Sequence, residues 1–530
     1  MKILVCDPIS SKGIELFQNQ SEFNVVVLDS RPSEDELITL AADASAIVVR
    51  SETKVTAKVM DAAKQLKVVG RAGVGVDNID SEAATQRGIV VMNTPGGNTI
   101  STAELTFSML MALARRIPQA HMSMKNGEWN RKAFKGVELY QKTLGVLGMG
   151  RIGGEVAKRA IAFGMKVVAY DPYMSKAKAQ ELNVDLVDNL EEVFPLADFI
   201  TVHMPMTDET RGMLDAAAFG KMKKGVKLLN CARGGIIDEN DLVAAIESGQ
   251  VAGAALDVYE TEPLPADSPL RGSAEIVMTP HLGASTTEAQ ENVGIEVAET
   301  ITEYLLTGSV RNGINMPNLD EKIYAQVKPY LNLGEKLGRV LAQIAPKRND
   351  RLVVTLGGLV AELPGDPITR YVLKGFLEGA GGKDVNQVNV RALAGGLGLL
   401  VEEIKSNEKT YFNDWLHVAV YSGEQRFSVS GYCHGSQREP RVARMNSLWL
   451  EFVPEGVLLI LGNTDRPGLV GHLGTLLGNH GVNIANMSLS RDEESGRALT
   501  ALNLDTVPPQ ELLDELEADP DLCNVRVVQL

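Results

Sequence analysis

The stretch 143–171 limits the possible fold of this chain more than any other part of the sequence. It starts with a short apolar run typical of a β-strand, Thr143–Leu147, which leads into the glycine-rich motif Gly148–Gly153. A helical pattern follows over residues 151–163, and a second apolar run, Lys166–Tyr170, ends at an acidic residue. Strand, glycine turn, helix and strand in this order predict a βαβ unit of a parallel sheet.

The three glycines of this motif predict a dinucleotide site. Gly148 permits a tight turn, Gly150 lets the backbone approach a pyrophosphate, and Gly153 lets the helix pack closely on the strand. The helix N-terminus offers free N–H groups and a positive dipole end to the phosphates. Asp171 lies 23 residues after Gly148, where its carboxylate can accept hydrogen bonds from the adenosine ribose and repel a 2′-phosphate. We therefore expect NAD rather than NADP, with a structural glycine turn that binds no ligand as the alternative.

The composition excludes several classes of function. A chain of 530 residues has room for three or four domains, and its net charge of −16 argues against nucleic acid or an anionic membrane as a partner. No apolar run approaches the ~18 residues of a membrane span, and the first strand-like run is too short for a signal peptide. The four cysteines are widely spaced, without a pair typical of a metal site. We expect a cytoplasmic protein with free thiols and no bound metal.

Residues 2–93 alternate strand-like runs with helical patterns, which predicts a second parallel α/β sheet. The expected strands are Ile3–Cys6, Val25–Leu28, Ala46–Val49, Val68–Arg71 and Ile89–Met92. Arg50 and Arg71 lie at the carboxyl ends of two of these strands, the edge at which open α/β sheets bind ligands. With the turn at Gly73 and Gly75 they predict an anion-binding cleft, and solvated loop charges are the alternative.

Two segments are expected to connect this sheet with the dinucleotide-binding part. A turn cluster begins at Thr94 and is followed by a helix over 102–116. Its residues Pro95–Asn98 are interpreted as a hinge between two lobes, with an ordinary loop as the alternative. A second helix is predicted over 285–305. Its expected cap is Ser285, because Glu288 stands three residues further on, the spacing of a capping box.

Arg233, Glu262 and His281 follow strand-like runs and form a candidate catalytic set. Oxidation of an alcohol by hydride transfer needs a base for the hydroxyl proton, and histidine titrates near neutral pH. A carboxylate bound to the other ring nitrogen fixes the tautomer and raises the basicity of the ring, which is the role expected of Glu262. An arginine can hold the carboxylate of a 2-hydroxy acid through paired, charge-assisted hydrogen bonds. Taken singly, each of the three can also be an ordinary loop residue.

Several motifs of the chain resemble those of a known enzyme family. The motifs similar to the D-2-hydroxyacid dehydrogenases are residues 230–238, 256–263 and 280–286. Those that resemble, more narrowly, the D-3-phosphoglycerate dehydrogenase branch are residues 70–78, 91–98 and 148–153. The likeness covers the whole chain. It implies NAD-dependent oxidation of 3-phospho-D-glycerate to 3-phosphooxypyruvate, the first step of the phosphorylated route to L-serine.

This resemblance also implies roles for individual residues. His281 matches the acid/base, Glu262 its partner, and Arg233 the residue that holds the substrate carboxylate. The positions that match cofactor contacts are Gly148, Gly150, Arg151, Ile152, Gly153, Asp171, Cys231, Ala232, Arg233, Asp257, His281, Gly283 and Ala284. The positions that match substrate contacts are Gly73, Val74, Gly75 and Asn98, with Arg50 and Arg71 suited to the phosphate. Some relatives carry a hydroxyl residue in place of Val74, so a side-chain contact to cofactor is lost there.

The last part of the chain resembles an ACT domain, a small module that senses amino acids. The motif at 462–474 is similar to its opening, and in serine-sensing relatives the effector lies between paired ACT domains. The resemblance implies an L-serine site formed by Asn463, Asp465 and Asn483. A domain that only dimerises, without a ligand, is the alternative.

Residues 318–452 resemble the intervening domain of the long-form enzymes, a module thought to bind anions. Its basic cluster, Arg438, Arg441 and Arg444, is equally well explained as a solvated charged face.

The expected architecture is therefore α/β with four domains. A Rossmann-type NAD domain (98–283) is inserted in a flavodoxin-like substrate domain (1–97 and 284–315), followed by an α+β intervening domain (318–452) and a βαββαβ ACT domain (457–530). The resemblance further implies a homotetramer. Two other functions stay open: a reductase of hydroxypyruvate, glyoxylate or another 2-hydroxy acid, and an NAD-sensing corepressor or scaffold on the same fold.

Overall fold

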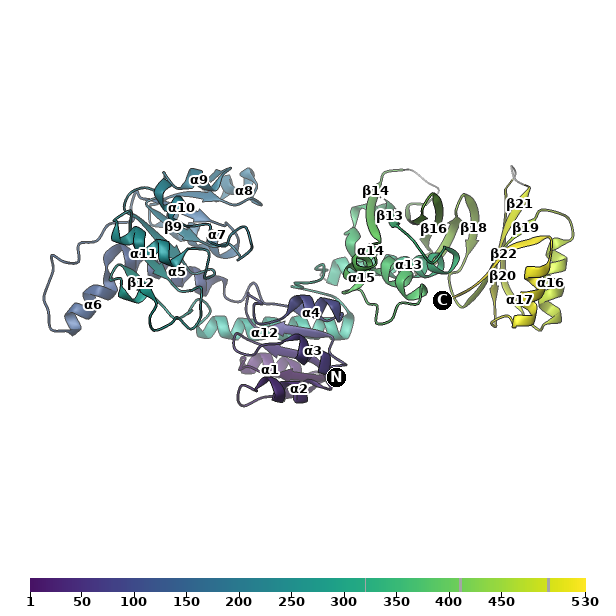
Figure 1. The fold of residues 1–530 in the computed structure, drawn as a ribbon, viewed down its shortest axis with the longest axis horizontal. Coiled ribbons are helices and arrows are strands. Elements are labelled where there is room, and N and C mark those ends of the chain that lie inside the picture. The colour runs from purple at the N-terminus through teal and green to yellow at the C-terminus, as the bar shows by residue number, and fades with distance from the viewer. Residues whose placement is uncertain (320, 409–411, 493–495) are drawn as a thin grey trace.

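The computed structural model describes residues 1–319, 321–408, 412–492 and 496–530. Within these residues the chain forms four β-sheets, each with its own helices (Figure 1). The sheets follow one another along the chain, except that the seven-stranded sheet is inserted between two parts of the five-stranded unit. None of the described helices is both long and apolar enough to cross a membrane.

The first unit, the five-stranded lobe, contains a fully parallel sheet of order β2-β1-β3-β4-β5. Its elements are β1 (Lys2–Val5), α1 (Ser11–Gln18), β2 (Asn24–Val27), α2 (Glu34–Ala41), β3 (Ala44–Val49), α3 (Ala57–Ala62), β4 (Val68–Arg71), α4 (Ser81–Gln86) and β5 (Val90–Met92). All of β3 is buried because helices cover both faces of the sheet. This strand order is the flavodoxin-like one expected from the sequence.

The second unit, the seven-stranded lobe, is also fully parallel, with the order β12-β11-β10-β9-β6-β7-β8. Its strands are β6 (Thr143–Leu147), β7 (Lys166–Tyr170), β8 (Asp185–Val187), β9 (Phe199–Val202), β10 (Val226–Asn230), β11 (Val251–Leu256) and β12 (Ile276–Met278). Its helices are α5 (Thr99–Arg115), α6 (Ile117–Lys125), α7 (Arg151–Ala162), α8 (Lys176–Glu181), α9 (Leu190–Val193), α10 (Ala216–Lys221) and α11 (Glu239–Glu247). The Rossmann-type fold predicted from the glycine motif is confirmed.

The chain passes between these two lobes at α5 and at α12 (Thr287–Thr307), which extends in teal from the seven-stranded lobe across the five-stranded sheet in Figure 1. Gly70 of β4 leaves room for Val297 and Ile301 of α12, since a side chain there would overlap both. The predicted cap of this helix was wrong. Thr286, not Ser285, accepts the hydrogen bond from the N–H of Ala289, at 3.1 Å, and the helix begins one residue later than a Ser285 cap requires.

The third unit has a six-stranded sheet of order β14-β13-β15-β16-β17-β18, in which β13 and β14 are parallel and the other neighbours antiparallel. Its elements are α13 (Glu321–Ile344), β13 (Arg351–Gly358), α14 (Gly365–Gly379), α15 (Val390–Gly396), β14 (Leu400–Ser406), β15 (Asp414–Ser422), β16 (Gln425–His434), β17 (Glu439–Met445) and β18 (Leu448–Phe452). Apolar side chains of α13 and α14 share one core with the sheet. This is the expected α+β module.

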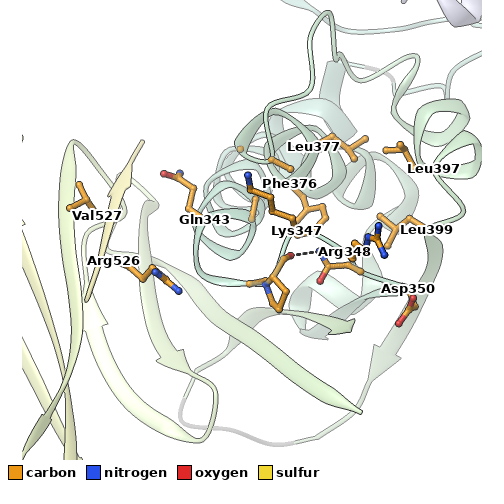
Figure 2. A pocket seen from close by; sticks show the side chains of 16 residues that line it. Gln343, Lys347, Arg348, Asp350, Phe376, Leu377, Leu397, Leu399, Arg526 and Val527 are labelled. Atoms are coloured by element: carbon orange, nitrogen blue, oxygen red, sulfur yellow. Dashed lines mark hydrogen bonds between the residues drawn. The ribbon is translucent and has the colours of Figure 1, made fainter. Parts of the chain in front are cut away.

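The last unit has an antiparallel sheet of order β20-β21-β19-β22. Its elements are β19 (Val457–Thr464), α16 (Leu469–Asn479), β20 (Ile484–Asp492), β21 (Arg497–Leu504), α17 (Gln510–Ala518) and β22 (Leu522–Gln529). The βαββαβ order predicted for these residues is confirmed. A cavity of about 960 Å³ lies between this unit and the third, with Lys347, Arg348 and Phe376 on one side and Arg526 and Val527 of β22 on the other (Figure 2).

The glycine turn gives a direct test of how closely α7 must pack on β6. A Cβ at Gly153 would overlap the carbonyl oxygen of Gly148, a backbone atom that cannot turn away, whereas Gly154 faces open space. We expect Gly153→Ala to lower the free energy of unfolding by about 1–3 kcal/mol and to weaken NAD binding. Gly154→Ala is the matched control and should be neutral or stabilising by up to about 1 kcal/mol. Chemical denaturation and NAD titration of both variants check this, and equal behaviour of the two would contradict it.

Candidate active site

The carboxyl ends of the parallel strands in both lobes border one cleft. A cavity of about 270 Å³ lies in it, and residues from both lobes line it. The lining residues are Val74, Asn98, Thr102, Ile152, His203, Met204, Pro205, Cys231, Ala232, Arg233, Asp257, His281, Gly283 and Ala284. Most of the candidate residues after β10, β11 and β12 are thus brought together. The cavity between the third and fourth units is larger, but it lies far along the chain from the candidate catalytic residues.

The glycine turn is shaped to receive a dinucleotide. Gly148 has a φ of +95°, which favours glycine, and a side chain there would run into the carbonyl of His203. Nothing lies within 4 Å of where a Cβ of Gly150 would be, so a ligand can approach the backbone closely. The N-terminus of α7, at Arg151, has no side-chain cap, so its N–H groups are available to phosphates. These residues fit a bound NAD.

Asp171 stands directly after β7, beside the glycine turn. Its carboxylate accepts hydrogen bonds from the N–H of Met149, at 2.7 Å, and from that of Tyr173, at 2.8 Å. One oxygen therefore bridges β7 to the turn. Its contact with the ribose of NAD stays a prediction.

His281 and Glu262 form the hydrogen bond expected from the sequence. Nδ1 of His281 lies 2.7 Å from Oε2 of Glu262, and Oε1 of Glu262 accepts from the N–H of Tyr259 at 3.0 Å. The bond to Glu262 raises the pKa of His281 above its usual range, against the opposing effect of burial. Burial alone raises the pKa of Glu262, but the bonds from His281 and Tyr259 outweigh it, so this pKa lies below its usual range. The pair therefore favours a charged carboxylate beside an imidazole that is more basic than usual.

The loop that carries His281 is held by Asp257, which is fully buried. Its Oδ1 accepts from the hydroxyl of Thr279 at 2.6 Å and from the N–H of Leu282 at 2.7 Å, and its Oδ2 from the N–H of Gly283 at 2.9 Å. Burial raises the pKa of Asp257, and these bonds oppose the shift. The sequence indicated Asp257 as a cofactor contact. The structure gives its carboxylate the further task of bracing the loop.

This loop is tightly constrained. His281 has a φ of +55°, a left-handed conformation that is rare outside glycine and asparagine. The hydroxyls of Ser101 and Thr102 in α5 both donate to the carbonyl of Gly283, at 2.7 and 3.0 Å. Neither hydroxyl was identified from the sequence. Such strain persists only where the surroundings enforce it, and it fixes the direction in which the imidazole points.

Arg233 follows β10 and reaches toward the five-stranded lobe. The side chain of Asn230 shapes its turn, donating to the carbonyl of Arg233 at 2.8 Å and accepting from the N–H of Ala232 at 3.0 Å. A Cβ at Gly75 would overlap the Arg233 guanidinium and lie 3.0 Å from Nη1 of Arg71. Two arginines from different lobes therefore converge over one glycine.

Arg71 is the more confined of these two arginines. It donates to the carbonyl of Arg50 and to the hydroxyl of Ser51, both at 3.1 Å. Burial, and secondarily the charge of Arg233, lowers the pKa of Arg71 to about 10. Both effects disfavour the positive charge of Arg71, so an anion placed there would offset them by stabilising the charged guanidinium.

Arg50 is placed differently from Arg71. Its guanidinium contacts the carbonyl of Pro8 at 3.4 Å, while its own N–H donates to the carboxylate of Asp7 at 2.6 Å. The anion cleft predicted from both arginines is thus centred on Arg71 and Arg233, with Arg50 at its margin.

Three further residues line the cavity. The Asn98 side chain lines it, and its Oδ1 is buried without a hydrogen-bond partner among the described residues. His203, absent from the sequence-based set, is half-buried, with its Nε2 3.0 Å from the hydroxyl of Thr201, and desolvation lowers its pKa to about 4. It is neutral at ordinary pH. Burial raises the pKa of Cys231 to about 12, so its thiol stays protonated.

The three residues expected to bind serine lie in separate contacts. Asn463 is buried in β19, where its side chain accepts from the hydroxyl of Thr500 at 2.8 Å. Asp465 pairs with Arg491 at 3.2 Å, and Asn483 donates to Asp505 at 2.8 Å. Within one chain, Asp465 and Asn483 are accessible from the domain surface and Asn463 is not.

The three arginines of the third unit also have separate partners. Arg438 donates to the Tyr330 hydroxyl, Arg441 lies 3.6 Å from Glu439, and Arg444 donates to the carbonyl of Ser447.

Comparison with known proteins supports the same division of the chain. Residues 107–283 match the sequence model of the NAD-binding domain of D-isomer specific 2-hydroxyacid dehydrogenases. Residues 326–446 match the D-3-phosphoglycerate dehydrogenase intervening domain, and residues 457–521 match the ACT domain. Among solved structures, the TT0316 protein of Thermus thermophilus is 36% identical, with a TM-score of 0.54 over 59% of this chain and 100% of that one. An NAD-dependent formate dehydrogenase from Staphylococcus aureus, solved in complex with NAD, is 29% identical, with a TM-score of 0.53 over 59% of this chain and 99% of its own.

Curated relatives align with this chain from end to end. The D-3-phosphoglycerate dehydrogenase of Methanocaldococcus jannaschii is 42% identical over 530 residues, covering 100% of both chains. That of Bacillus subtilis is 40% identical over 529 residues, covering 100% of this chain and 99% of its own. That of Synechocystis is 44% identical over 530 residues, covering 100% of this chain and 95% of its own. With its NAD-binding, intervening and ACT domains, this chain belongs to the D-3-phosphoglycerate dehydrogenase family.

Proposed function

We propose that the protein oxidises 3-phospho-D-glycerate to 3-phosphooxypyruvate with NAD⁺, as the first step of the phosphorylated route to L-serine. The observation that carries this proposal is the meeting, around one cleft, of a basic imidazole from one lobe and two converging arginines from both. The imidazole suits removal of a hydroxyl proton. The two arginines suit an anion with more than one charged group.

His281 and Glu262 act on the proton of the reacting hydroxyl. NAD⁺, when bound at the glycine turn, supplies the acceptor for the hydride. Nδ1 of His281 is engaged with Glu262, so Nε2 is the atom left to accept the proton. The carboxylate stabilises the imidazolium that forms, and the Asp257-braced loop holds the ring in position.

Arg233 holds the substrate carboxylate, while Arg71 and Arg50 attract the phosphate. Arg233 and His281 line the same cavity, and the charge of Arg233 opposes the rise in the pKa of His281, so the carboxylate end is placed beside the base. Arg71 stands on the other lobe, at the far side of Gly75. The turn Gly73–Gly75, with Val74, and the unpartnered amide of Asn98 supply further polar contacts to the substrate.

L-serine is proposed as the effector, bound by ACT domains that pair between two chains. Asp465 is suited to the ammonium group and Asn483 to the carboxylate or hydroxyl. Asn463 is proposed to act by holding the strand beneath the site, because its own side chain is satisfied inside the domain.

A homotetramer in the cytoplasm is proposed as the working form. Support comes from the arm of α6 and the connection after it, which exposes Met122, Met124, Trp129 and Tyr140; the exposed fraction of Trp129 is 77%. Exposed apolar side chains of this kind mark a contact surface.

The proposed domain boundaries are those expected from the sequence: 1–97 with 284–315, 98–283, 318–452 and 457–530.

The substrate proposal is tested by comparing 3-phosphoglycerate with unphosphorylated glycerate as substrates with NAD⁺. We expect kcat/KM for 3-phosphoglycerate to be at least ~100-fold higher, since two or more charge-assisted contacts are added by the phosphate. Arg71→Gln should remove most of this preference, whereas Arg115→Gln, at the far end of α5, should keep it. Equal turnover of both acids by the unaltered protein would contradict the proposal and favour a reductase of an unphosphorylated 2-hydroxy acid.

The base is tested by the pH dependence of oxidation. Only neutral His281 accepts a proton, so kcat/KM should fall as pH falls through its raised pKa. Glu262→Gln removes the bond that raises this pKa, so the acid limb should move to lower pH while the plateau falls about 100-fold. Glu260→Gln, two residues away and exposed, should leave the acid limb in place. An acid limb unmoved in Glu262→Gln would exclude His281 as the titrating base.

The effector proposal is tested by adding L-serine to the 3-phosphoglycerate assay. Millimolar L-serine should lower the initial rate, and Asp465→Asn should raise the concentration needed for half-inhibition by about 10-fold or more, since it removes the partner of the ammonium group. Asp514→Asn, on the exposed side of α17, is the control. No response of rate or thermal stability to L-serine would leave the ACT domain as a dimerising module.

A further inference from the structure

Asp77 is a carboxylate at the cleft to which neither the family resemblance nor the proposed chemistry gives a role. It follows β4 and the turn at Gly75 in the five-stranded lobe, and its side chain is 78% exposed. Oδ2 of Asp77 lies 3.7 Å from Nε of Arg233, which follows β10 in the seven-stranded lobe. This ion pair therefore spans the cleft between the two lobes.

The same carboxylate lies among both converging arginines. A Cβ at Gly75 would lie 2.7 Å from Oδ2 of Asp77 and 3.0 Å from Nη1 of Arg71, and would overlap the Arg233 guanidinium. Only glycine leaves space for these three side chains above the turn. The arrangement holds two positive groups and one negative group at the place where an anionic substrate is expected.

The charges show what Asp77 does to this cluster. The guanidinium of Arg233 disfavours the charge of Arg71, and Asp77 favours it. Arg71 has no carboxylate partner within ion-pair distance among the described residues, and its hydrogen bonds go to a carbonyl and a hydroxyl. Asp77 is thus a local counter-ion that partly neutralises the two arginines before any ligand arrives.

We propose that Asp77 is an internal competitor for Arg233: it pairs with the guanidinium in the empty cleft and gives way when the carboxylate of a 2-hydroxy or 2-oxo acid binds. The incoming carboxylate must break an existing ion pair, so its net gain is smaller than a free arginine would give. Asp77 therefore weakens the binding of substrate and of product alike. Weaker substrate binding keeps the Michaelis constant from falling far below the working concentration of the substrate, and weaker product binding shortens the residence time of the product. The identity of the acid rests on the proposed function, but the competition for Arg233 does not.

The test measures anion binding without turnover. Full-length protein saturated with NAD⁺ is titrated calorimetrically with oxalate, a small dicarboxylate that carries no hydrogen to transfer. Because exposed ion pairs contribute roughly 0.2–1 kcal/mol, Asp77→Asn should lower the dissociation constant of oxalate roughly 1.5- to 5-fold. Asp77→Ala should do the same, and Asp77→Glu, which keeps the charge, should remain close to the unaltered protein. NAD affinity measured in parallel shows that each variant is folded.

A matched control removes a nearby charge that has no such contact. Glu52 is an exposed carboxylate in the loop after β3, and the described residues offer it no ion pair, so Glu52→Gln should leave oxalate binding unchanged. An unchanged or higher dissociation constant in Asp77→Asn overturns the proposal, the latter by showing that Asp77 orients Arg233 for binding. If 3-phosphoglycerate proves not to be the substrate while oxalate still binds more tightly to Asp77→Asn, the proposed function fails and this inference stands.

Discussion

Parallel strand direction is the constraint on which the rest of the active site depends. In both N-terminal lobes every strand runs the same way, so all carboxyl ends lie at one edge of each sheet. The two edges face a common cleft, and residues that are far apart in sequence, such as Arg71 and Arg233, meet there. An antiparallel arrangement would place half of these loops at the opposite edge. The chemistry of the site is therefore a consequence of topology before it is one of individual side chains.

Two acidic groups, the buried Asp257 and the more exposed Glu262, then give this cleft a defined geometry. Asp257 gives up its solvation to accept three hydrogen bonds from the loop of His281, and Glu262 holds the imidazole itself. Charge-assisted hydrogen bonds of this kind are stronger than neutral ones, and they offset the energetic cost of the left-handed backbone at His281. On the substrate side positive charge is in excess, since Arg71 and Arg233 have less negative charge near them than they need. The half of the cleft around His281 is therefore fixed before a ligand binds, and the half around the arginines is completed by the ligand.

Much of the fold is predictable from local patterns because each pattern has a local cause. The run Lys166–Tyr170 forms β7 at its predicted bounds, and the glycine turn starts α7 at Arg151 as expected. The cap of α12 is different, since Ser285 and Thr286 are adjacent hydroxyl residues with the same chemistry. Only the path of the chain decides which one faces the free N–H groups, and it favours Thr286.

The site residues that sequence reasoning missed depend on long-range contacts. Thr102 and Gly283 meet only because α5 packs beneath the loop after β12, and no local pattern indicates it. Asp77 stands inside a recognised motif, but its pairing with Arg233 joins two lobes. Asn463 was predicted as an effector contact, but it lies in a strand, where alternate residues face inward, and the sheet directs its side chain inward to Thr500. The contacts of these residues arise only when the separate parts of the chain have packed together.

The insertion of one lobe within the other has a consequence for synthesis on the ribosome. One face of the five-stranded sheet is covered by α1 and by α12, and Val297 and Ile301 of α12 fit against Gly70 of β4. That helix begins at residue 287, and β5 ends at residue 92, so the residues 93–286 are made in between, 286 − 92 = 194 of them. At 5–20 residues per second, the part of this apolar face that α12 covers stays exposed for roughly 10–40 s. The first lobe to be translated is therefore completed only after the second, and the nascent chain must keep an open hydrophobic surface while a whole Rossmann domain is added.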